Sequence, residues 1–448
     1  MTALFASRAL LARGWAEEVR IEIGPDGTIT RLIERGPARG AERVAGVVLP
    51  GMPNLHGHAF QRAMAGLAER LPEGESTFWT WRGVMYRFAQ RITPDSLRAI
   101  ATQLYVEMLK AGYTAHAEFH YLHGTEQGGD PLPMAEALLA AAEESGIALT
   151  LLPSLYLTGG IDGRPLEGAQ HRFALDLDGY VRLLERLDGR VALGIAPHSL
   201  RAVPPPLLRR LVEWWTARAP GRPIHLHLAE QVREVREVME ATGRRPGELL
   251  FETVAPDERW CLIHATHLDD RELTALAGSG AVAGLCPTTE ANLGDGMFRL
   301  GDWLAAGGRL GIGSDSHVSV SPVEELRLLD YGQRLSTLSR IAAASAAEPH
   351  AGAALWRRAA LGGAQALGRD AGQLAPGRHA DLVVVNDGHP LLVGREGDAL
   401  LDTLVFAGNV PLVGDVMVGG RWVVRDGRHP GEEVAALAYR EALAALAA

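Results

Sequence analysis

Two histidines flank a single glycine at the end of an apolar segment, and this triplet, His56-Gly57-His58, could bind a metal ion. In a β-strand, residues two positions apart point to the same face, so both imidazoles can converge on one ion. Gly57 has no side chain and lets the backbone approach the ion closely. Because such a triplet also occurs as two hydrogen-bonded histidines at a strand end, it does not establish a metal site by itself.

Further histidines and acids follow three later apolar segments. His227 lies near the end of one of them, and Glu230 follows it by three residues. That offset places a carboxylate near a metal without making it a ligand, which suits proton transfer. His264 and Asp315 end two more segments, whereas His225, one layer deeper than His227, is expected to be a core histidine.

Three imidazoles and one carboxylate are a ligand set suited to zinc or iron. A set of this size leaves one coordination position for water, whose pKa zinc lowers from about 15.7 to about 7. The combination of HxH, HxxE, His and Asp at successive segment ends is far more specific than any one member. It therefore predicts an open, catalytic metal site.

Eight apolar segments must position these groups, and helical patterns such as 96–112 and 207–219 lie between most of them. Eight strand–helix units predict an α/β fold of the TIM-like (β/α)8 barrel type, whose chemistry lies at the carboxyl ends of the strands. The predicted strands are 47–58, 114–120, 148–156, 191–199, 223–230, 261–267, 282–289 and 310–317. The polar residues at their ends are His56, His58, Glu118, His198, His227, Glu230, His264 and Asp315.

The two ends of the chain have a different pattern from the middle. Residues 1–50 and 371–448, including 402–409, alternate apolar and polar residues between turns, as antiparallel strands do. A helical pattern over 432–448 closes the chain. We therefore predict a small β-sandwich domain built from both termini, with the terminal helix, around a barrel at 51–370.

Charge and lysine usage exclude several classes of function. The 448 residues include 44 basic and 54 acidic side chains, for a net charge of −10, without a basic run. We therefore expect no nucleic acid or anionic membrane as a partner. The single lysine, Lys110, lies near the end of a predicted helix and is expected to be a solvated cation there. Lysine-based Schiff-base and P-loop mechanisms are thereby excluded.

The cysteines and the first twenty residues indicate the compartment of the cell in which the protein is expected. Cys261 and Cys286 are the two cysteines, and each lies in an apolar run, as expected for core packing in a reducing compartment. Arg, Gly and Trp interrupt the first twenty residues too often for a signal peptide. Since no apolar stretch approaches the roughly 18 residues of a membrane span, we expect a cytoplasmic protein.

The order of HxH, HxxE, His and Asp resembles that of the amidohydrolase superfamily, in its deaminase branch. The stretches GMPNLHGHAFQRAMAGLAE, STFWTWRGVMYRFA and APHSLRAV are similar to the N-formimidoyl-L-glutamate deiminase family. That resemblance implies hydrolysis of N-formimidoyl-L-glutamate to N-formyl-L-glutamate and ammonia, in histidine degradation. It also implies, together with the aromatic segment 78–81, a homodimer.

The resemblance assigns roles to the polar residues. It implies metal binding by His56, His58, His227 and Asp315, and catalytic roles for Glu230, His264 and Asp315. Many relatives hold two metals bridged by a modified lysine on the fourth strand, and 191–199 contains no lysine. We therefore expect one divalent metal ion per subunit, Zn²⁺ or alternatively Fe²⁺.

Five residues align with the family's substrate-binding positions: Gln61, Arg82, Tyr121, His198 and Arg201. A small-molecule dicarboxylate needs cationic and hydroxyl donors, and the Arg201 guanidinium could hold one carboxylate in a two-point contact. Tyr121 and His198 could donate to the other carboxylate, while Gln61 could contact either an amide-like group or a carboxylate. An arginine at the surface or a tyrosine in the core is the ordinary alternative for each of them.

Two other functions are compatible with the same residues. A deaminase of the same branch acting on a purine, pyrimidine or adenosine derivative would use the same metal chemistry, with groups that stack on a flat ring. A barrel without catalytic activity could serve as a scaffold. The metal content of the purified protein separates the scaffold from both enzymes.

Overall fold

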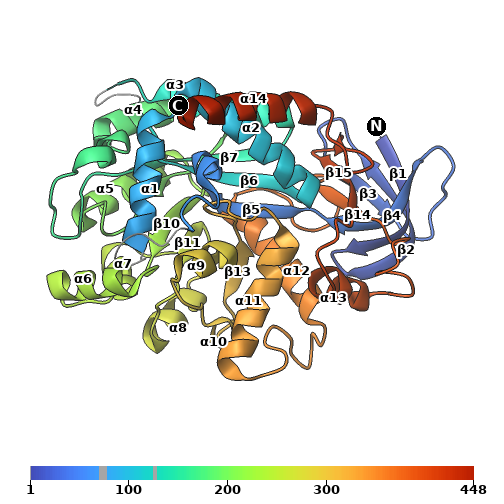
Figure 1. Cartoon of the computed structure of the whole chain (residues 1–448). Helices are drawn as coiled ribbons and strands as arrows, with labels where there is room; N and C mark the ends of the chain where they lie inside the picture. Colours follow the sequence, from blue (N-terminus) through green and yellow to red (C-terminus); the bar gives the residue numbers. More distant parts are fainter. Residues whose placement is uncertain (1, 70–77, 125–128, 448) are drawn as a thin grey trace.

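The structure, a computed structural model, describes residues 2–69, 78–124 and 129–447, with the side chains of 78–80 excepted. Figure 1 shows a barrel surrounded by helices and, beside it, a sheet that combines N-terminal strands (blue) with strands from the C-terminal part of the chain (orange to red). The predicted α/β barrel with a β-sheet domain from both termini is thereby confirmed.

Parallel strands form the barrel at all eight predicted positions. The fourth position is divided into two short strands, both paired with the third. Single bridges between Ile195 and Ile224 and between Gly57 and Asp315 join the two halves of the ring. The strands are β5 (Met52–Gly57), β6 (Tyr113–His120), β7 (Ala148–Leu155), β8 (Ala192–Leu193) with β9 (Ala196–Pro197), β10 (Ile224–Leu228), β11 (Trp260–His264), β12 (Val282–Leu285) and β13 (Arg309–Ile312).

Helices cover the outside of the barrel, which buries its strands on both faces and explains why they are continuous apolar runs. The helices between barrel strands are η1 (Ala59–Met64), α1 (Phe78–Arg91), α2 (Pro94–Ala111), α3 (Leu132–Ser145), η2 (Gly168–Arg172), α4 (Leu177–Leu187), α5 (Pro205–Arg218), α6 (Val232–Thr242), α7 (Pro246–Thr253), α8 (Asp270–Gly278), α9 (Pro287–Leu293) and α10 (Leu300–Ala305). After β13 follow α11 (Pro322–Thr337) and α12 (Ala351–Ala366).

The terminal segments form one seven-stranded sheet in the order β16-β15-β14-β4-β1-β2-β3. The predicted strand 47–58 is therefore two strands, because the chain passes from this sheet into the barrel at Gly51. We propose domain boundaries after residues 50 and 370, between β4 and β5 and between α12 and β14. The sheet comprises β1 (Thr2–Leu11), β2 (Gly14–Ile23), β3 (Ile29–Ile33), β4 (Glu42–Pro50), β14 (Leu382–Val385), β15 (Val413–Val418) and β16 (Arg421–Val424).

The strand predicted at 402–409 is wrong, because most of this segment belongs to helix α13 (Asp398–Phe406). Its buried residues are Leu400, Leu401, Leu404 and Val405, which is helical spacing. The helix packs against α12. The apolar stripe becomes visible only when the residues before 402 are included, which is why the shorter segment resembled a strand.

The single lysine stabilises the contact of the terminal helix with the barrel. Helix α14 (Glu432–Ala447) lies across α2 at the top of Figure 1. Lys110 Nζ, in the last turn of α2, lies 2.6 Å from Glu432 Oε2 in the first turn of α14. The predicted position near the end of a helix is confirmed, but the expected solvated cation is instead paired with a carboxylate of another helix.

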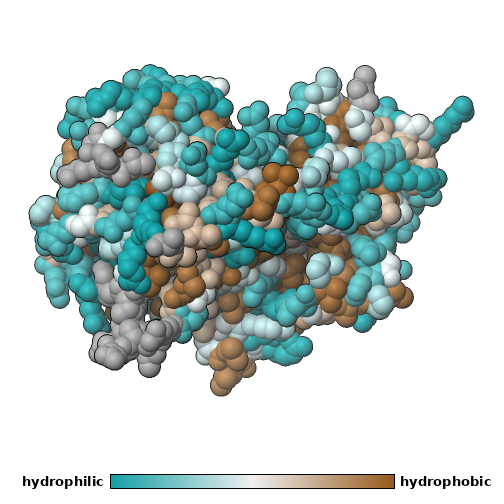
Figure 2. All heavy atoms as spheres, turned by 45° about the horizontal axis from the view of Figure 1, so that its top comes forward, coloured by the Kyte–Doolittle hydropathy of each residue, from teal (hydrophilic) through white to brown (hydrophobic). Residues whose placement is uncertain are grey.

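Hydrophilic residues predominate on the face shown in Figure 2, and its hydrophobic residues lie in separate small groups. Within the described parts of the chain, no helix combines the length and the apolar character that a membrane span requires. Cys261 and Cys286 are both free and buried, so their predicted packing role is confirmed.

A buried histidine makes the stability of this fold sensitive to acid. His123, just after β6, donates its Nε2 proton to the carbonyl oxygen of Ser154 at 2.6 Å, and burial lowers its pKa to about 4. Between pH 6.5, the ordinary pKa of histidine, and pH 4, His123 is protonated in the unfolded chain but not in the folded chain. Stability must fall as the pH falls through this window.

We predict that His123→Gln loses less stability than the wild type between pH 6.5 and pH 5. The expected difference is about 2 kcal/mol, measured by urea unfolding at both pH values. His171→Gln, at a partly exposed position, is the control and should follow the wild type. Parallel pH dependences for His123→Gln and the wild type would contradict the prediction.

Candidate active site

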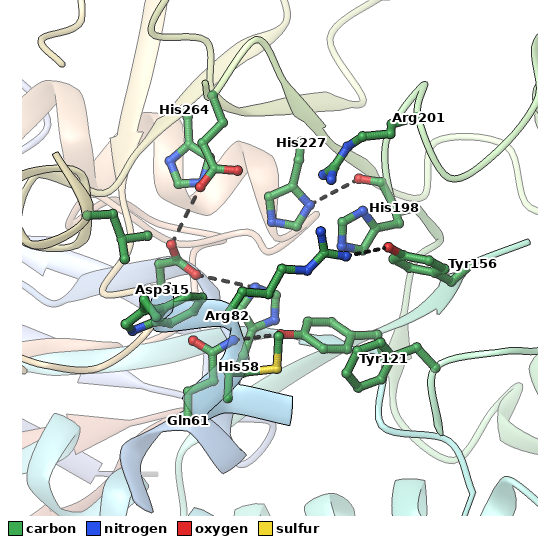
Figure 3. Close-up of a pocket in the computed structure, with 15 residues that line it drawn as sticks. His58, Gln61, Arg82, Tyr121, Tyr156, His198, Arg201, His227, His264 and Asp315 are labelled. Atoms are coloured by element: carbon green, nitrogen blue, oxygen red, sulfur yellow. Dashed lines mark hydrogen bonds and ion pairs between the residues drawn. The ribbon is translucent and has the colours of Figure 1, made fainter. Parts of the chain in front are cut away.

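One pocket at the carboxyl ends of the barrel strands contains nearly all of the predicted site residues. His56 is the exception, because it lies fully buried beneath the pocket floor. Figure 3 shows the other predicted side chains around one cavity. The lining residues are His58, Gln61, Trp81, Arg82, Met85, Tyr121, Tyr156, Phe173, His198, Arg201, His227, Glu230, His264, Leu293 and Asp315.

Three imidazoles at the ends of two barrel strands form a triad that could hold a metal ion. His56 lies on β5, His58 directly follows that strand, and His227 lies on β10 across the barrel. One ligand nitrogen from each ring lies within 4.8 Å of the others. Asp315 Oδ1 is close to the same atoms, at 3.4 Å from His56 Nε2 and 3.3 Å from His58 Nε2.

Main-chain carbonyls determine which nitrogen of each ring faces this centre. His58 donates its Nδ1 proton to Phe119 O at 2.8 Å, and His227 donates its Nδ1 proton to His198 O at 3.0 Å. Both rings therefore present an Nε2 lone pair inward. His227 Nε2 lies 3.2 Å from His56 Nε2, and the carboxylate of Asp315 completes the set. Electron-rich atoms that face one another so closely fit a divalent cation between them.

Burial keeps these imidazoles in the neutral form that a metal requires. It lowers the pKa of His58 to about 3, and it lowers the pKa of His56 and His227 well below the ordinary value. The neighbouring imidazoles contribute in the same direction, because a second positive charge would be unfavourable. Protons therefore compete weakly for these nitrogens.

The backbone around Asp315 is tied to the triad. The Asp315 amide donates to His56 O at 3.0 Å, and the His58 amide donates to Asp315 O at 3.0 Å. Asn54 donates its amide to Ser314 Oγ at 2.6 Å. Asp315 has a φ of +44°, a left-handed conformation that is unusual for a residue with a side chain.

His264 lies among carboxylates on the opposite side of the pocket. Its Nε2 is 3.8 Å from Glu230 Oε1 and 3.7 Å from Asp315 Oδ2, and its Nδ1 is 3.2 Å from Glu290 Oε1. Burial disfavours the imidazolium, but Glu230, Glu290 and Asp315 outweigh it and raise the pKa of His264 to about 10. The ring is therefore positively charged at neutral pH and can donate a proton or a hydrogen bond.

Glu230 follows β10 and is held by a second carboxylate. Glu234 accepts hydrogen bonds from the amides of Ala229 and Glu230, at 3.3 and 3.1 Å. Burial raises the pKa of Glu230, against the opposing effect of His264. A carboxyl group with a raised pKa can accept and return a proton, so Glu230 has the properties of a general acid and base.

The remaining wall carries hydrogen-bond donors and cations. Gln61 donates its amide to Tyr121 Oη at 2.6 Å, and Arg82 donates to Tyr156 Oη at 3.0 Å (Figure 3). Burial opposes the charge of Arg201, but Tyr156, Glu234 and Glu230 outweigh it and raise its pKa. The cavity thus has a metal-binding and carboxylate half and a half suited to anions.

The structure separates two strand-end residues from the site. Glu118 does not line the cavity; it accepts the amide of Ala59 at 2.9 Å and supports η1. His225, predicted as a core residue, donates its Nε2 proton to Ala366 O at 2.7 Å.

Two polar residues that contact predicted site residues were not found from the sequence. Tyr156 lines the pocket at the end of the third barrel strand, and its position there was a usable signal. Glu290 contacts His264 from α9, across 26 residues of chain, and nothing in the local sequence indicated this contact.

Comparisons with known proteins agree with this geometry. Residues 47–423 match the amidohydrolase family, and residues 1–44 match the N-terminal domain of formimidoylglutamate deiminase HutF. The chain is 52% identical over 454 residues to formimidoylglutamate deiminase from Pseudomonas aeruginosa, with 100% of both chains covered. It is 31% identical over 440 residues to 8-oxoguanine deaminase from the same species, covering 94% of this chain and 93% of that one. The crystal structure of an amidohydrolase from Brucella melitensis has a TM-score of 0.93 and 44% identity, with 100% of both chains covered.

The glycine of the HxH triplet leads to a testable prediction, because a side chain there has no room. A Cβ atom at Gly57 would lie 2.3 Å from His317 Cε1 and 2.9 Å from His116 Cε1. Gly57→Ala must therefore displace the strand that carries His56 and His58. We expect zinc affinity to fall by about 10- to 100-fold, measured by chelator competition on metal-depleted protein.

Gly278→Ala is the matched control, since nothing lies within 4 Å of a Cβ atom there. This variant should bind zinc like the wild type. Equal affinities for Gly57→Ala and Gly278→Ala would show that the close packing around Gly57 does not position the triad.

Proposed function

The chain belongs to the amidohydrolase family and, within it, to the formimidoylglutamate deiminases, and we propose that the pocket hydrolyses N-formimidoyl-L-glutamate to N-formyl-L-glutamate and ammonia. This reaction is a step of histidine degradation. The observation that carries the proposal is the division of one cavity into a metal-binding half and an anion-binding half.

The anion-binding half matches the two carboxylates of the substrate. Arg201 is charged and can make a two-point contact with one of them. Arg82 donates to Tyr156. Burial raises the pKa of Tyr121 well above its ordinary value, so the hydroxyl keeps its proton and can donate it while its oxygen accepts from Gln61. Gln61 Oε1 is buried and has no hydrogen-bond partner among the residues that the structure describes, so it can accept an N–H of the formimidoyl group.

His56, His58, His227 and Asp315 would hold one divalent metal ion. We propose zinc, with iron(II) as the alternative, because three imidazoles and a carboxylate suit both. When bound, such an ion acts as a Lewis acid and lowers the pKa of water at the site.

The residues of the chain move the protons of the reaction. Asp315 accepts the first proton of the attacking water, and Glu230 protonates the imino nitrogen of the substrate. The oxygen of water bonds to the formimidoyl carbon, which gives a tetrahedral centre with a hydroxyl and an amino group. Glu230 then carries the hydroxyl proton to the amino nitrogen, the C–N bond breaks, ammonia leaves and the formyl C=O bond forms, and the proton held by Asp315 restores Glu230. His264 donates to the tetrahedral centre that forms between these steps, which its positive charge stabilises.

The two alternatives that the sequence left open are less consistent with these observations. A purine deaminase is also a relative, but its identity of 31% is well below the 52% of the formimidoylglutamate deiminase. A scaffold would not need a complete metal-binding triad next to a raised-pKa carboxyl group.

We further propose a homodimer, as the resemblance implies, and a cytoplasmic location. Two buried free cysteines are consistent with a reducing compartment. Leu335 and Leu338, at the end of α11, are 76% and 92% exposed and are candidates for a subunit contact. The aromatic segment 78–81 cannot support the dimer here, because the side chains of 78–80 lie outside the described residues.

A substrate panel with ammonia detection tests the proposed function. We expect zinc-loaded protein to release ammonia from N-formimidoyl-L-glutamate and not from guanine, cytosine or 8-oxoguanine. Formamidine, which lacks both carboxylates, is the matched control and should react with a much higher KM. Activity on a base but not on N-formimidoyl-L-glutamate would reject the proposal.

The role of Glu230 gives a second prediction. Glu230→Gln keeps the size of the side chain and removes its proton transfer, so kcat should fall by about 10²- to 10⁴-fold with metal content unchanged. Glu240→Gln, at an exposed position of the following helix α6, should keep wild-type kcat. Near-normal turnover by metal-loaded Glu230→Gln would show that another group transfers the proton.

A further inference from the structure

We infer that Glu290 is a positioning residue for His264: its carboxylate accepts the Nδ1 proton of that ring and thereby turns Nε2 toward the substrate. Glu290 lies on α9, is 4% exposed and does not line the cavity. The inference rests on the proposed function in one respect, because its kinetic assay uses the proposed substrate. The contact between Glu290 and His264 does not depend on that function.

The two nitrogens of His264 have different environments. Nδ1 lies within hydrogen-bond distance of Glu290 Oε1, at 3.2 Å. Nε2 is 3.8 Å from Glu230 and 3.7 Å from Asp315, beyond the distance of a hydrogen bond. The contact with Glu290 thus leaves Nε2 available to a substrate.

Glu290 is itself fixed in place. Its Oε1 also accepts the amide proton of Cys286 at 2.9 Å, and Cys286 is fully buried. The main-chain carbonyl of Glu290 accepts the amide of Asp295 at 2.9 Å. The carboxylate cannot turn away from His264 without leaving a buried amide unpaired, which is unfavourable.

His264 needs such an anchor because its backbone leaves the regular strand. His264 and Ala265 have φ values of +66° and +50°, so the chain turns sharply at the end of β11. The pleat of the strand therefore does not determine how the ring is oriented. A carboxylate on the outer nitrogen of a functional imidazole fixes the orientation of the ring.

A purely structural role for Glu290 is the competing explanation, since the same carboxylate stabilises the start of α9. Glu325 provides a matched comparison at that helix start. It is fully buried, and it accepts the amide of Thr288 at 2.9 Å and its hydroxyl at 2.6 Å. Glu325→Gln should therefore affect stability without affecting His264.

The kinetic test compares these two substitutions in zinc-loaded protein. We expect Glu290→Gln to lower kcat by about 10- to 100-fold, with KM and metal content near those of the wild type. Glu325→Gln should keep kcat within about twofold. Equal kcat values for Glu290→Gln and the wild type would overturn the inference.

A double-mutant cycle separates positioning from general structural damage. In a His264→Asn background, Glu290→Gln should change kcat by less than about twofold, because the ring on which Glu290 acts is gone. The same fold-loss in both backgrounds would show that Glu290 acts independently of His264. If Glu290→Gln does not fold, Glu290→Asp enters the same cycle under the same criterion.

Nitrogen NMR of histidine-labelled wild type tests the geometry without any substrate, with His264→Asn assigning the resonances. We expect the Nδ1 of His264 to carry a proton. An unprotonated Nδ1 would overturn the inference even if the enzyme is active. A protonated Nδ1 in a protein that fails the substrate panel would instead reject the proposed function alone.

Discussion

The main-chain carbonyls of Phe119 and His198 each accept the Nδ1 proton of a buried imidazole, and the metal-binding half of the site depends on these two hydrogen bonds. Each bond fixes a tautomer, so that an Nε2 lone pair faces inward. Burial adds to this effect, because it makes protonation of the rings unfavourable. A cluster of neutral nitrogens beside a carboxylate is thereby kept ready for a cation.

Closure of the barrel brings these groups together. The bridge between Gly57 and Asp315 joins the first and last barrel strands, and the main chain of Asp315 bonds to that of both His56 and His58. Asp315 is thus held against His56 and His58, although it lies more than 250 positions away from them in the chain. Gly313, two residues before Asp315, allows this contact, since a Cβ atom there would lie 2.7 Å from the carbonyl oxygen of His56.

The charged side chains around the cavity form two groups, one around His264 and one around Arg201. Glu230, Asp315 and Glu290 surround His264, so a buried imidazolium is stable there. Arg201 lies on the other side, where Glu234 and Glu230 favour its charge. The proposed substrate fits this separation in part, because its side-chain carboxylate lies at the far end from its basic imino nitrogen and its α-carboxylate lies between them. The electrostatics of the cavity are therefore suited to orienting that substrate.

The sequence by itself determined the eight barrel strands, the metal triad and the polar residues at the strand ends. Strand periodicity and residue type are local properties, and parallel strands necessarily bring their carboxyl ends to one edge. Only the tertiary structure decided that 402–409 belongs to a helix, that Glu118 supports η1, and that Tyr156 and Glu290 contact Arg82 and His264. These features depend on which distant segments pack together, and a contact between separate elements leaves no periodic signal in the chain.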